Sequence, residues 1–411
     1  MNDPFVALRH RNFRLLWGSQ LVSMAGSMMQ SAAVLWHVSL LVRPEQRGLA
    51  LGMVGLVRVV PIVVLSLVAG VVADAVDRRR LLLVTQTGMA CAAAGLAFVT
   101  FAGVHALWPV YALAAAGAAF GSFDGPARNA LIPNLVPREH LANAISLNTI
   151  MFQIAAVAGP ALGGLVIGTL GVGWTYALNG VSFLAVIAAL LLLRDVPARA
   201  GEGVARISLA AAREGLRFVF REPLIRSTML LDFFATFFAS ANALLPIFAQ
   251  DVLAVGARGY GLLSAAPSVG ALLTSVVLAH RMDRIERRGR IMLVSVAGYG
   301  LATIAFGVSR NLWLTFACLA LTGVTDTVSM VIRNIIRQLN TPDELRGRMT
   351  SVNMIFFMGG PQLGELEAGL VAHAFGAVAS VVTGGLACVA ATAWVAARTP
   401  ALRAYRRAPE P

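Results

Sequence analysis

The sequence contains no lysine, few acidic residues and little charge of either sign. All 33 basic residues are arginine, against 20 aspartate and glutamate residues, and charged residues make up 13% of the chain. Hydrophobic residues make up 58%, and the mean hydropathy is +0.75. An average soluble domain carries about 25% charged residues, so this composition excludes an ordinary soluble protein.

Cysteine is also scarce, and the three cysteines lie far apart inside apolar segments. A disulfide framework or a metal site needs clustered spacing, so we interpret them as small buried side chains. The sequence lacks a Walker loop, a nucleophile elbow, a His/Asp metal cluster and a fused acyltransferase. These absences argue against an enzyme, an ATP-driven pump, and a resident metal or cofactor.

Apolar runs of 18 or more residues recur along the whole chain, and each is long enough to cross about 30 Å of hydrocarbon as a helix. The first run follows a basic start and matches its successors in length, so no cleavable signal peptide is expected. The sequence predicts an all-α membrane protein with twelve transmembrane helices, near 13–41, 48–74, 81–103, 106–125, 141–169, 172–194, 226–253, 259–281, 291–309, 311–336, 347–374 and 376–397.

The arginines are concentrated in alternate connections between these spans. The other connections hold only Arg43, Arg47, Arg258 and Arg310. Cytoplasmic loops of membrane proteins carry the excess of basic residues, so both termini are predicted to be cytoplasmic. The net charge of +13 is explained by this orientation and does not indicate nucleic-acid binding.

The longest connection, 195–225, divides the chain into two predicted six-helix bundles, 1–194 and 226–411. Within it, 207–220 has an amphipathic pattern, which predicts a linker helix lying along the cytoplasmic membrane face.

The two bundles are related by an internal repeat. At an offset of 205, Arg128-Asn129 matches Arg333-Asn334, Asn148 matches Asn353, and Gly164 matches Gly369. An offset of 206 aligns the earlier spans, where Pro61 matches Pro267. Matches at a stable offset predict parallel repeats around a central cavity. Symmetric positions are interpreted as scaffold and gate, and the asymmetric pairs Arg58/Ser264, Pro160/Glu365 and Leu162/Glu367 as the first places to seek specificity and coupling.

Three motifs carry a resemblance to a known family. Residues 70–80 read GVVADAVDRRR, residues 159–164 read GPALGG, and residues 126–144 read PARNALIPNLVPREHLANA, followed by NGVSF at 179–183. The first two resemble the loop 2–3 motif and the antiporter signature of the major facilitator superfamily. The third resembles its drug/siderophore exporter branch, which contains macrolide efflux proteins and the enterobactin exporter.

The resemblance implies the roles of several residues. Gly70 would allow close helix packing, Asp74 would cap a neighbouring helix, and the basic pair Arg79 and Arg80 would anchor the cytoplasmic face. The second motif implies a kink at Gly159-Pro160 and close helix approach at Gly163-Gly164. Three departures from the family stand out. Ala75 and Asp77 replace a usual basic residue and a usual glycine, which predicts an altered gate, and the fourth span lacks the arginine of many proton-coupled antiporters.

Ionisable residues inside the spans are the main site candidates, because each costs about 3 kcal/mol or more at mid-membrane without a partner or a function. Arg58 is predicted either to bind an anionic group or to form a static ion pair. Asp232, beside several phenylalanines, is predicted either to carry protons or to support helix packing. Asp326 precedes Arg333 by two turns, which favours a structural pair. Glu365 and Glu367 point about 200° apart, so at most one faces the cavity.

Three polar residues complete the candidate set. Asp124, at the cytoplasmic end of the fourth span, is predicted to be a loop or gate residue. Gln153 and Asn242, in the fifth and seventh spans, are further candidates for the substrate site.

These features together predict a secondary-active, proton-coupled exporter of amphipathic small molecules, such as drugs or siderophores, by alternating access. The expected setting is a monomer in the bacterial cytoplasmic membrane, with protons, the lipid bilayer and a small-molecule substrate as partners. A lipid or lysolipid flippase, an importer in the same fold, and a non-transporting membrane sensor remain alternatives.

Overall fold

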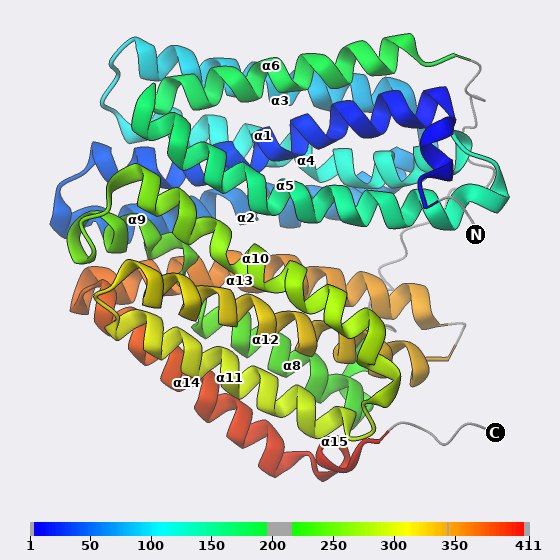
Figure 1. The fold of residues 1–411 in the computed structure, drawn as a ribbon, viewed down its shortest axis with the longest axis vertical. Helices are drawn as coiled ribbons and strands as arrows, with labels where there is room; N and C mark the ends of the chain where they lie inside the picture. The colour runs from blue at the N-terminus through cyan, green and yellow to red at the C-terminus, as the bar shows by residue number, and fades with distance from the viewer. Residues whose placement is uncertain (1–3, 195–215, 343–344, 407–411) are drawn as a thin grey trace. The chain divides into compact units, whose positions relative to one another are not determined.

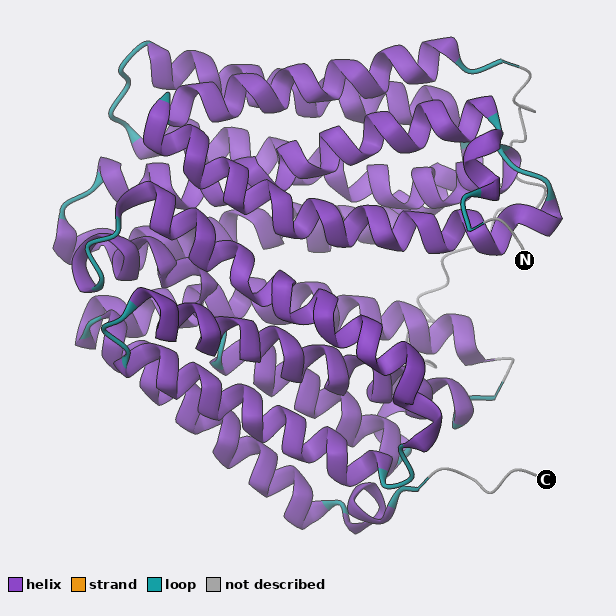
Figure 2. Ribbon diagram, viewed as in Figure 1, coloured by secondary structure: helices purple, strands orange, loops and turns teal. Residues whose placement is uncertain are grey.

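The computed structural model describes the chain except for residues 1–3, 195–215, 343–344 and 407–411, and except for some side chains within helices. Most of the predicted linker helix therefore lies outside the described residues. Helices and their connecting loops account for the whole described part, in which no strand occurs (Figures 1 and 2). The predicted all-helical fold is confirmed.

The long helices of the first half are α1 Arg11–Leu41, α2 Arg47–Ala75, α3 Arg78–Phe101, α4 Leu107–Leu131, α5 Leu141–Thr169 and α6 Val172–Leu192. Those of the second half are α8 Pro223–Phe238, α10 Gly256–Arg281, α11 Arg288–Val308, α12 Leu312–Leu339, α13 Arg346–Phe375 and α14 Ala377–Arg398. Short elements lie between or beyond them: η1 Val6–Arg9, η2 Pro44–Gln46, η3 Ile132–Asn134, η4 Arg138–His140, η5 Ala241–Leu244, α9 Leu245–Ile247, η6 Phe248–Val252, η7 Met282–Arg284 and α15 Pro400–Ala404.

Nine helical segments of the described chain are long and apolar enough to cross a membrane. Their outward faces are apolar as well. In α6, for example, the exposed large side chains are Trp174, Leu178, Val181, Leu184, Leu191 and Leu192. Such a face is stable against hydrocarbon but would promote aggregation in water.

The seventh predicted span, 226–253, is not one continuous helix. Helix α8 ends at Phe238, and the chain continues through η5, α9 and the π-helix η6. Pro246 lacks an amide hydrogen, and its ring would clash with the carbonyl of Asn242 in a continuous α-helix. Neighbouring helices stabilise the break, because the Tyr299 hydroxyl donates to the Ala239 carbonyl at 3.3 Å and the Ser240 hydroxyl to the Pro361 carbonyl at 3.2 Å.

Two compact units make up the chain: Met1–Leu41 with Val57–Arg206 and Gly256–Ala265, and Val42–Leu56 with Ile207–Val255 and Ala266–Pro411. Helix α2 therefore begins in the second unit and continues into the first, whereas α10 begins in the first and continues into the second. The division of the chain into bundles 1–194 and 226–411 remains a prediction from the repeat.

The same helix pairs pack together in both units. In the first, α1 packs against α5 and α6, and α3 against α4 and α6. In the second, α8 packs against α13 and α14, and α11 against α12 and α14. These pairs correspond under the sequence repeat. Cys318 and Cys388 are buried in the second unit, as expected, whereas Cys91 is exposed, and all three are free thiols. The prediction that Cys91 is buried was therefore wrong, because it lies on an outward face of α3.

Candidate functional site

The GPALGG segment of α5 contacts two different helices of the first unit. Gly159 lies against the Ala25 carbonyl and the Met28 side chain of α1, and Gly163 lies against Met29. Gly164 of α5 packs against α10, and a Cβ added to Gly164 would lie 2.5 Å from the Gly261 Cα. Since no side chain fits between these backbones, glycine is required for this crossing. Helix α5 continues through Pro160.

An equivalent crossing occurs in the second unit, between the start of α2 and α13. An added Cβ on Gly52 would lie 3.0 Å from the Gly369 Cα, and one on Gly55 would lie 2.8 Å from the Glu365 Cβ. The repeat matches Gly369 to Gly164. Glu365, which replaces Pro160 of the first half, is thus half-buried against α2, and Glu367 is also half-buried.

The loop 2–3 motif caps helices of the first unit. The Asp77 carboxylate accepts a hydrogen bond from the Arg80 amide at 2.8 Å and so caps α3. Arg78 donates to the Ala130 carbonyl at the end of α4, and Arg79 to the Leu191 carbonyl at the end of α6. Cations at helix C-termini satisfy free carbonyls and oppose the helix dipole. The packing around Gly70 and the side chain of Asp74 lie outside the described residues.

Asp124 is a buried residue inside α4. Its carboxylate accepts a hydrogen bond from the Gln86 amide at 2.7 Å and forms an ion pair with Arg128, one turn later in the same helix. Thr85 also points at this carboxylate, at 3.5 Å. The network joins α3 to α4 and satisfies a charge that would otherwise be costly to bury.

Arg333, the repeat counterpart of Arg128, is bound differently. Its side chain is 2% exposed and lies 2.9 Å from the Asp232 carboxylate of α8, which is 5% exposed. The same guanidinium lies 3.5 Å from Asp326, whose side chain is 46% exposed. The buried guanidinium of Arg333 therefore lies near two carboxylates. That of Asp232 is buried, and that of Asp326 is about half exposed. Asp326 and Arg333 were predicted to pair, and the structure places a third candidate residue, Asp232, beside the same guanidinium.

Arg337 and Tyr299 surround this group. Arg337, one turn beyond Arg333, lies within electrostatic range of Arg333 and Asp232, and its guanidinium donates to Asn334 and Asn353. The Tyr299 ring of α11 lies within range of both aspartates. Arg337 was not among the predicted site residues, although its repeat counterpart, Ile132, is apolar and the halves therefore differ at this position.

Arg58 is half-buried in α2 of the first unit. It lies within electrostatic range of Tyr176, whose hydroxyl is 3.2 Å from His37 Nδ1. Among the described residues, no carboxylate lies within ion-pair distance of Arg58. Gln153 of α5 is half-buried, and Asn242 is exposed in η5 at the break in the seventh span.

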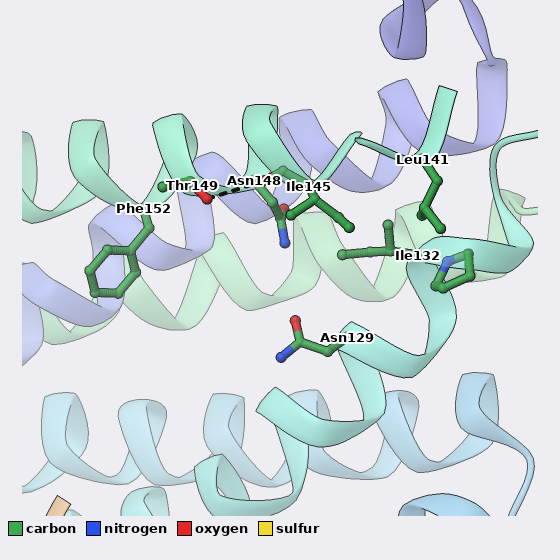
Figure 3. A pocket seen from close by; sticks show the side chains of 8 residues that line it. Asn129, Ile132, Leu141, Ile145, Asn148, Thr149 and Phe152 are labelled. Atoms are coloured by element: carbon green, nitrogen blue, oxygen red, sulfur yellow. Dashed lines mark hydrogen bonds between the residues drawn. The ribbon is translucent and has the colours of Figure 1, made fainter. Parts of the chain in front are cut away.

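A cavity of about 550 Å³ lies in the first unit, between the end of α4, η3 and the start of α5. Figure 3 shows Asn129 and the α5 side chains around it. Its lining consists of Asn129, Ile132, Pro133, Leu141, Ile145, Asn148, Thr149 and Phe152.

Comparison with known proteins identifies the family. The model of the transmembrane secretion effector family, within the major facilitator superfamily, matches residues 2–409. The chain belongs to this family. It is a family of membrane transporters, not of enzymes, so the chain is a multi-pass secondary transporter.

Relatives resemble this chain over nearly its whole length. The enterobactin exporter of Citrobacter koseri is 28% identical over 97% of the chain and 94% of the relative. That of Salmonella typhimurium is 28% identical over 97% and 95%. Among solved structures, a bacterial homologue of the human lysosomal transporter Spinster gives a TM-score of 0.74 at 15% identity, with 97% and 99% of the two chains covered. A POT family transporter in complex with 5-aminolevulinic acid gives 0.77 at 10% identity, with 95% and 96% covered. The structural matches establish the fold alone.

Proposed function

We propose that this secretion effector is a proton-coupled exporter of amphipathic small molecules. It acts as a monomer in the bacterial cytoplasmic membrane, with both termini in the cytoplasm, by alternating access. Siderophores are the first substrate class to test, because the curated relatives are named as enterobactin exporters. The close helix contacts of the GPALGG segment support export rather than import, since this signature is associated with exporters.

The sharing of Arg333 between Asp232 and Asp326 is the observation that carries the proposal. Asp232 is enclosed and lies nearer to the guanidinium, so it acts as the fixed counter-ion. Asp326 is more distant and far more exposed, so it is the carboxylate that a proton can reach and leave. A carboxylate that competes for one cation changes the local charge balance when it titrates.

The charges of the residues around Arg333 indicate what proton uptake by Asp326 changes. With both aspartates ionised, the negative charges of Asp232 and Asp326 balance the positive charges of Arg333 and Arg337. Proton uptake by Asp326 leaves one uncompensated positive charge and leaves Arg333 paired with Asp232 alone. Such a change biases a two-state element, because a buried net charge favours the state in which water reaches it. Substrate release and proton uptake are thereby linked.

Arg58 supports a substrate with an anionic or strongly accepting oxygen. It is an arginine within a span, with no carboxylate partner in the described part of the chain. A phenolate, catecholate or carboxylate oxygen of the substrate would satisfy this charge.

The test is substrate-induced proton flux in proteoliposomes, screened over siderophores and lipophilic drugs. The wild-type protein is expected to release internal protons when substrate is added, and Asp326→Asn to reduce the coupled flux about fivefold or more, because an amide does not titrate. Asp251→Asn is the matched control, since Asp251 is similarly exposed, at 45%, but pairs with Arg47.

Equal flux from Asp326→Asn and the wild type would refute this coupling role. Movement of labelled lysolipid without proton flux would instead favour the flippase alternative.

A further inference from the structure

The cavity between α4, η3 and α5 has an uncharged, mixed lining. Ile145, Asn148, Thr149 and Phe152 follow the three-and-four spacing of one helix face, so α5 presents a single stripe to the cavity (Figure 3). Asn129 faces this stripe from α4. The cavity therefore combines two side-chain amides with apolar and aromatic surface, and none of the described residues that line it is ionisable.

The two amides remain available to a ligand. The Thr149 hydroxyl already donates to the Ile145 carbonyl at 3.2 Å. In contrast, neither Asn129 nor Asn148 forms a side-chain hydrogen bond within the described part of the chain. Each amide offers both a donor and an acceptor, which is the complement of another amide or of a hydroxyl pair.

The internal repeat supplies a natural comparison for this cavity. The offset of 205 matches Asn129 to Asn334, Asn148 to Asn353 and Ile132 to Arg337. In the second unit, the Arg337 guanidinium donates to the Asn334 carbonyl oxygen at 2.6 Å and also to that of Asn353. Arg337 is 4% exposed, so its side chain is buried, whereas Asn353 is half-buried and Asn334 is exposed.

The two equivalent asparagine pairs, one in each half, are therefore arranged differently. In the second half an arginine ties the asparagine pair together, and in the first half an isoleucine leaves the equivalent pair apart around a cavity. Asn129 and Asn148 are therefore not needed to hold their helices together in the way that their counterparts are.

We infer that this cavity, the amide pocket, binds an uncharged aryl amide or phenol group of the transported molecule, and that the described counterpart in the second half, where Arg337 joins the two asparagines, does not. The inference rests on the proposed transport function. An anionic group would lose its hydration without gaining a cation, because the neighbouring Arg128 is paired with Asp124. Phe152, which is 47% exposed, offers a surface for an aromatic ring.

Binding is tested on the purified full chain in detergent with dansyl amide, a neutral probe whose fluorescence rises in apolar sites. Ile132→Arg, which copies the second half, is expected to weaken binding about tenfold by filling the pocket and tying up both amides. Asn148→Ala is expected to weaken it about fivefold through the lost hydrogen bond. Ile132→Leu is the size-matched control and is expected to bind as the wild type does.

Dansyl glycine, which carries a carboxylate, is expected to bind at least about fivefold more weakly than dansyl amide to the wild type. Gel filtration and heat unfolding check that each variant is folded, and Asn148→Ala provides a second test if Ile132→Arg is not.

Equal probe affinity in the wild type and Asn148→Ala, or a preference for dansyl glycine, would overturn the inference, since the probe would then be in the micelle or at another site. The proton-flux assay separates this outcome from the proposed coupling. Normal flux with binding insensitive to these substitutions refutes the pocket alone, whereas absent flux with the expected binding pattern refutes the coupling alone.

Discussion

Replacement of Asp232 with asparagine is expected to lower the free energy of unfolding by about 3–5 kcal/mol, because breaking a buried ion pair leaves one charge uncompensated. The remaining partner of Arg333 would be Asp326, which lies 3.5 Å away and has a side chain that is 46% exposed. Asparagine keeps the shape of aspartate, so packing changes little. The measurement is unfolding of the purified protein, with all variants in the same detergent.

Two controls make this result specific. Asp251→Asn removes an exposed carboxylate from the same unit and is expected to cost less than about 1 kcal/mol. The double variant Asp232→Asn with Arg333→Met removes the uncompensated charge and is expected to recover most of the loss. Similar stability of Asp232→Asn and Asp251→Asn would show that the ion pair does not stabilise the fold.

The fold was largely predictable because its main signals are local. Long apolar runs and the arginine-rich connections follow directly from the bilayer as solvent, and the repeat can be read without a structure. The break after Phe238 was not predicted. Pro246 is a local signal in this segment, but the place of the break depends on contacts between helices: the Tyr299 hydroxyl of α11 donates to the Ala239 carbonyl, and the Ser240 hydroxyl donates to the Pro361 carbonyl of α13. Such contacts leave no local sequence pattern.

The candidate site was only partly predictable, for a similar reason. Asp326 and Arg333 lie on one helix, so their pairing followed from spacing. Asp232 lies on another helix, and its contact with Arg333 depends on how α8 packs against α12. Asp77 departs from the loop 2–3 motif, in which glycine is usual, and in the structure its carboxylate caps α3.

Asymmetry between the two repeats is the sequence signal that best indicates candidate site residues. Comparison of the halves singled out Arg58 and Glu365, whose roles in binding and coupling remain predictions. The same comparison at Ile132 and Arg337 distinguishes an open cavity from a tied pair of asparagines.

Gly164→Leu is expected to reduce transport at least about tenfold, which corresponds to a loss of about 1.4 kcal/mol in the rate-limiting step. The backbone of α10 lies where the new side chain would begin, with the Gly261 Cα 2.5 Å and the Ala257 carbonyl oxygen 2.6 Å from an added Cβ. Main chain has no rotamer through which to move aside, so α5 and α10 must separate. The measurement is substrate efflux in cells, corrected for the amount of protein in the membrane.

Gly168→Ala is the matched control, one turn further along α5. An added Cβ there would meet the Arg258 side chain, 2.9 Å from its Cγ, and that flexible chain can rotate away. Near wild-type transport is therefore expected for Gly168→Ala. Equal activity of the two variants would mean that close approach of α5 and α10 is not needed in the transport cycle. Loss of transport in Gly164→Leu alone would place the requirement at this glycine crossing, rather than in the general helix propensity of α5.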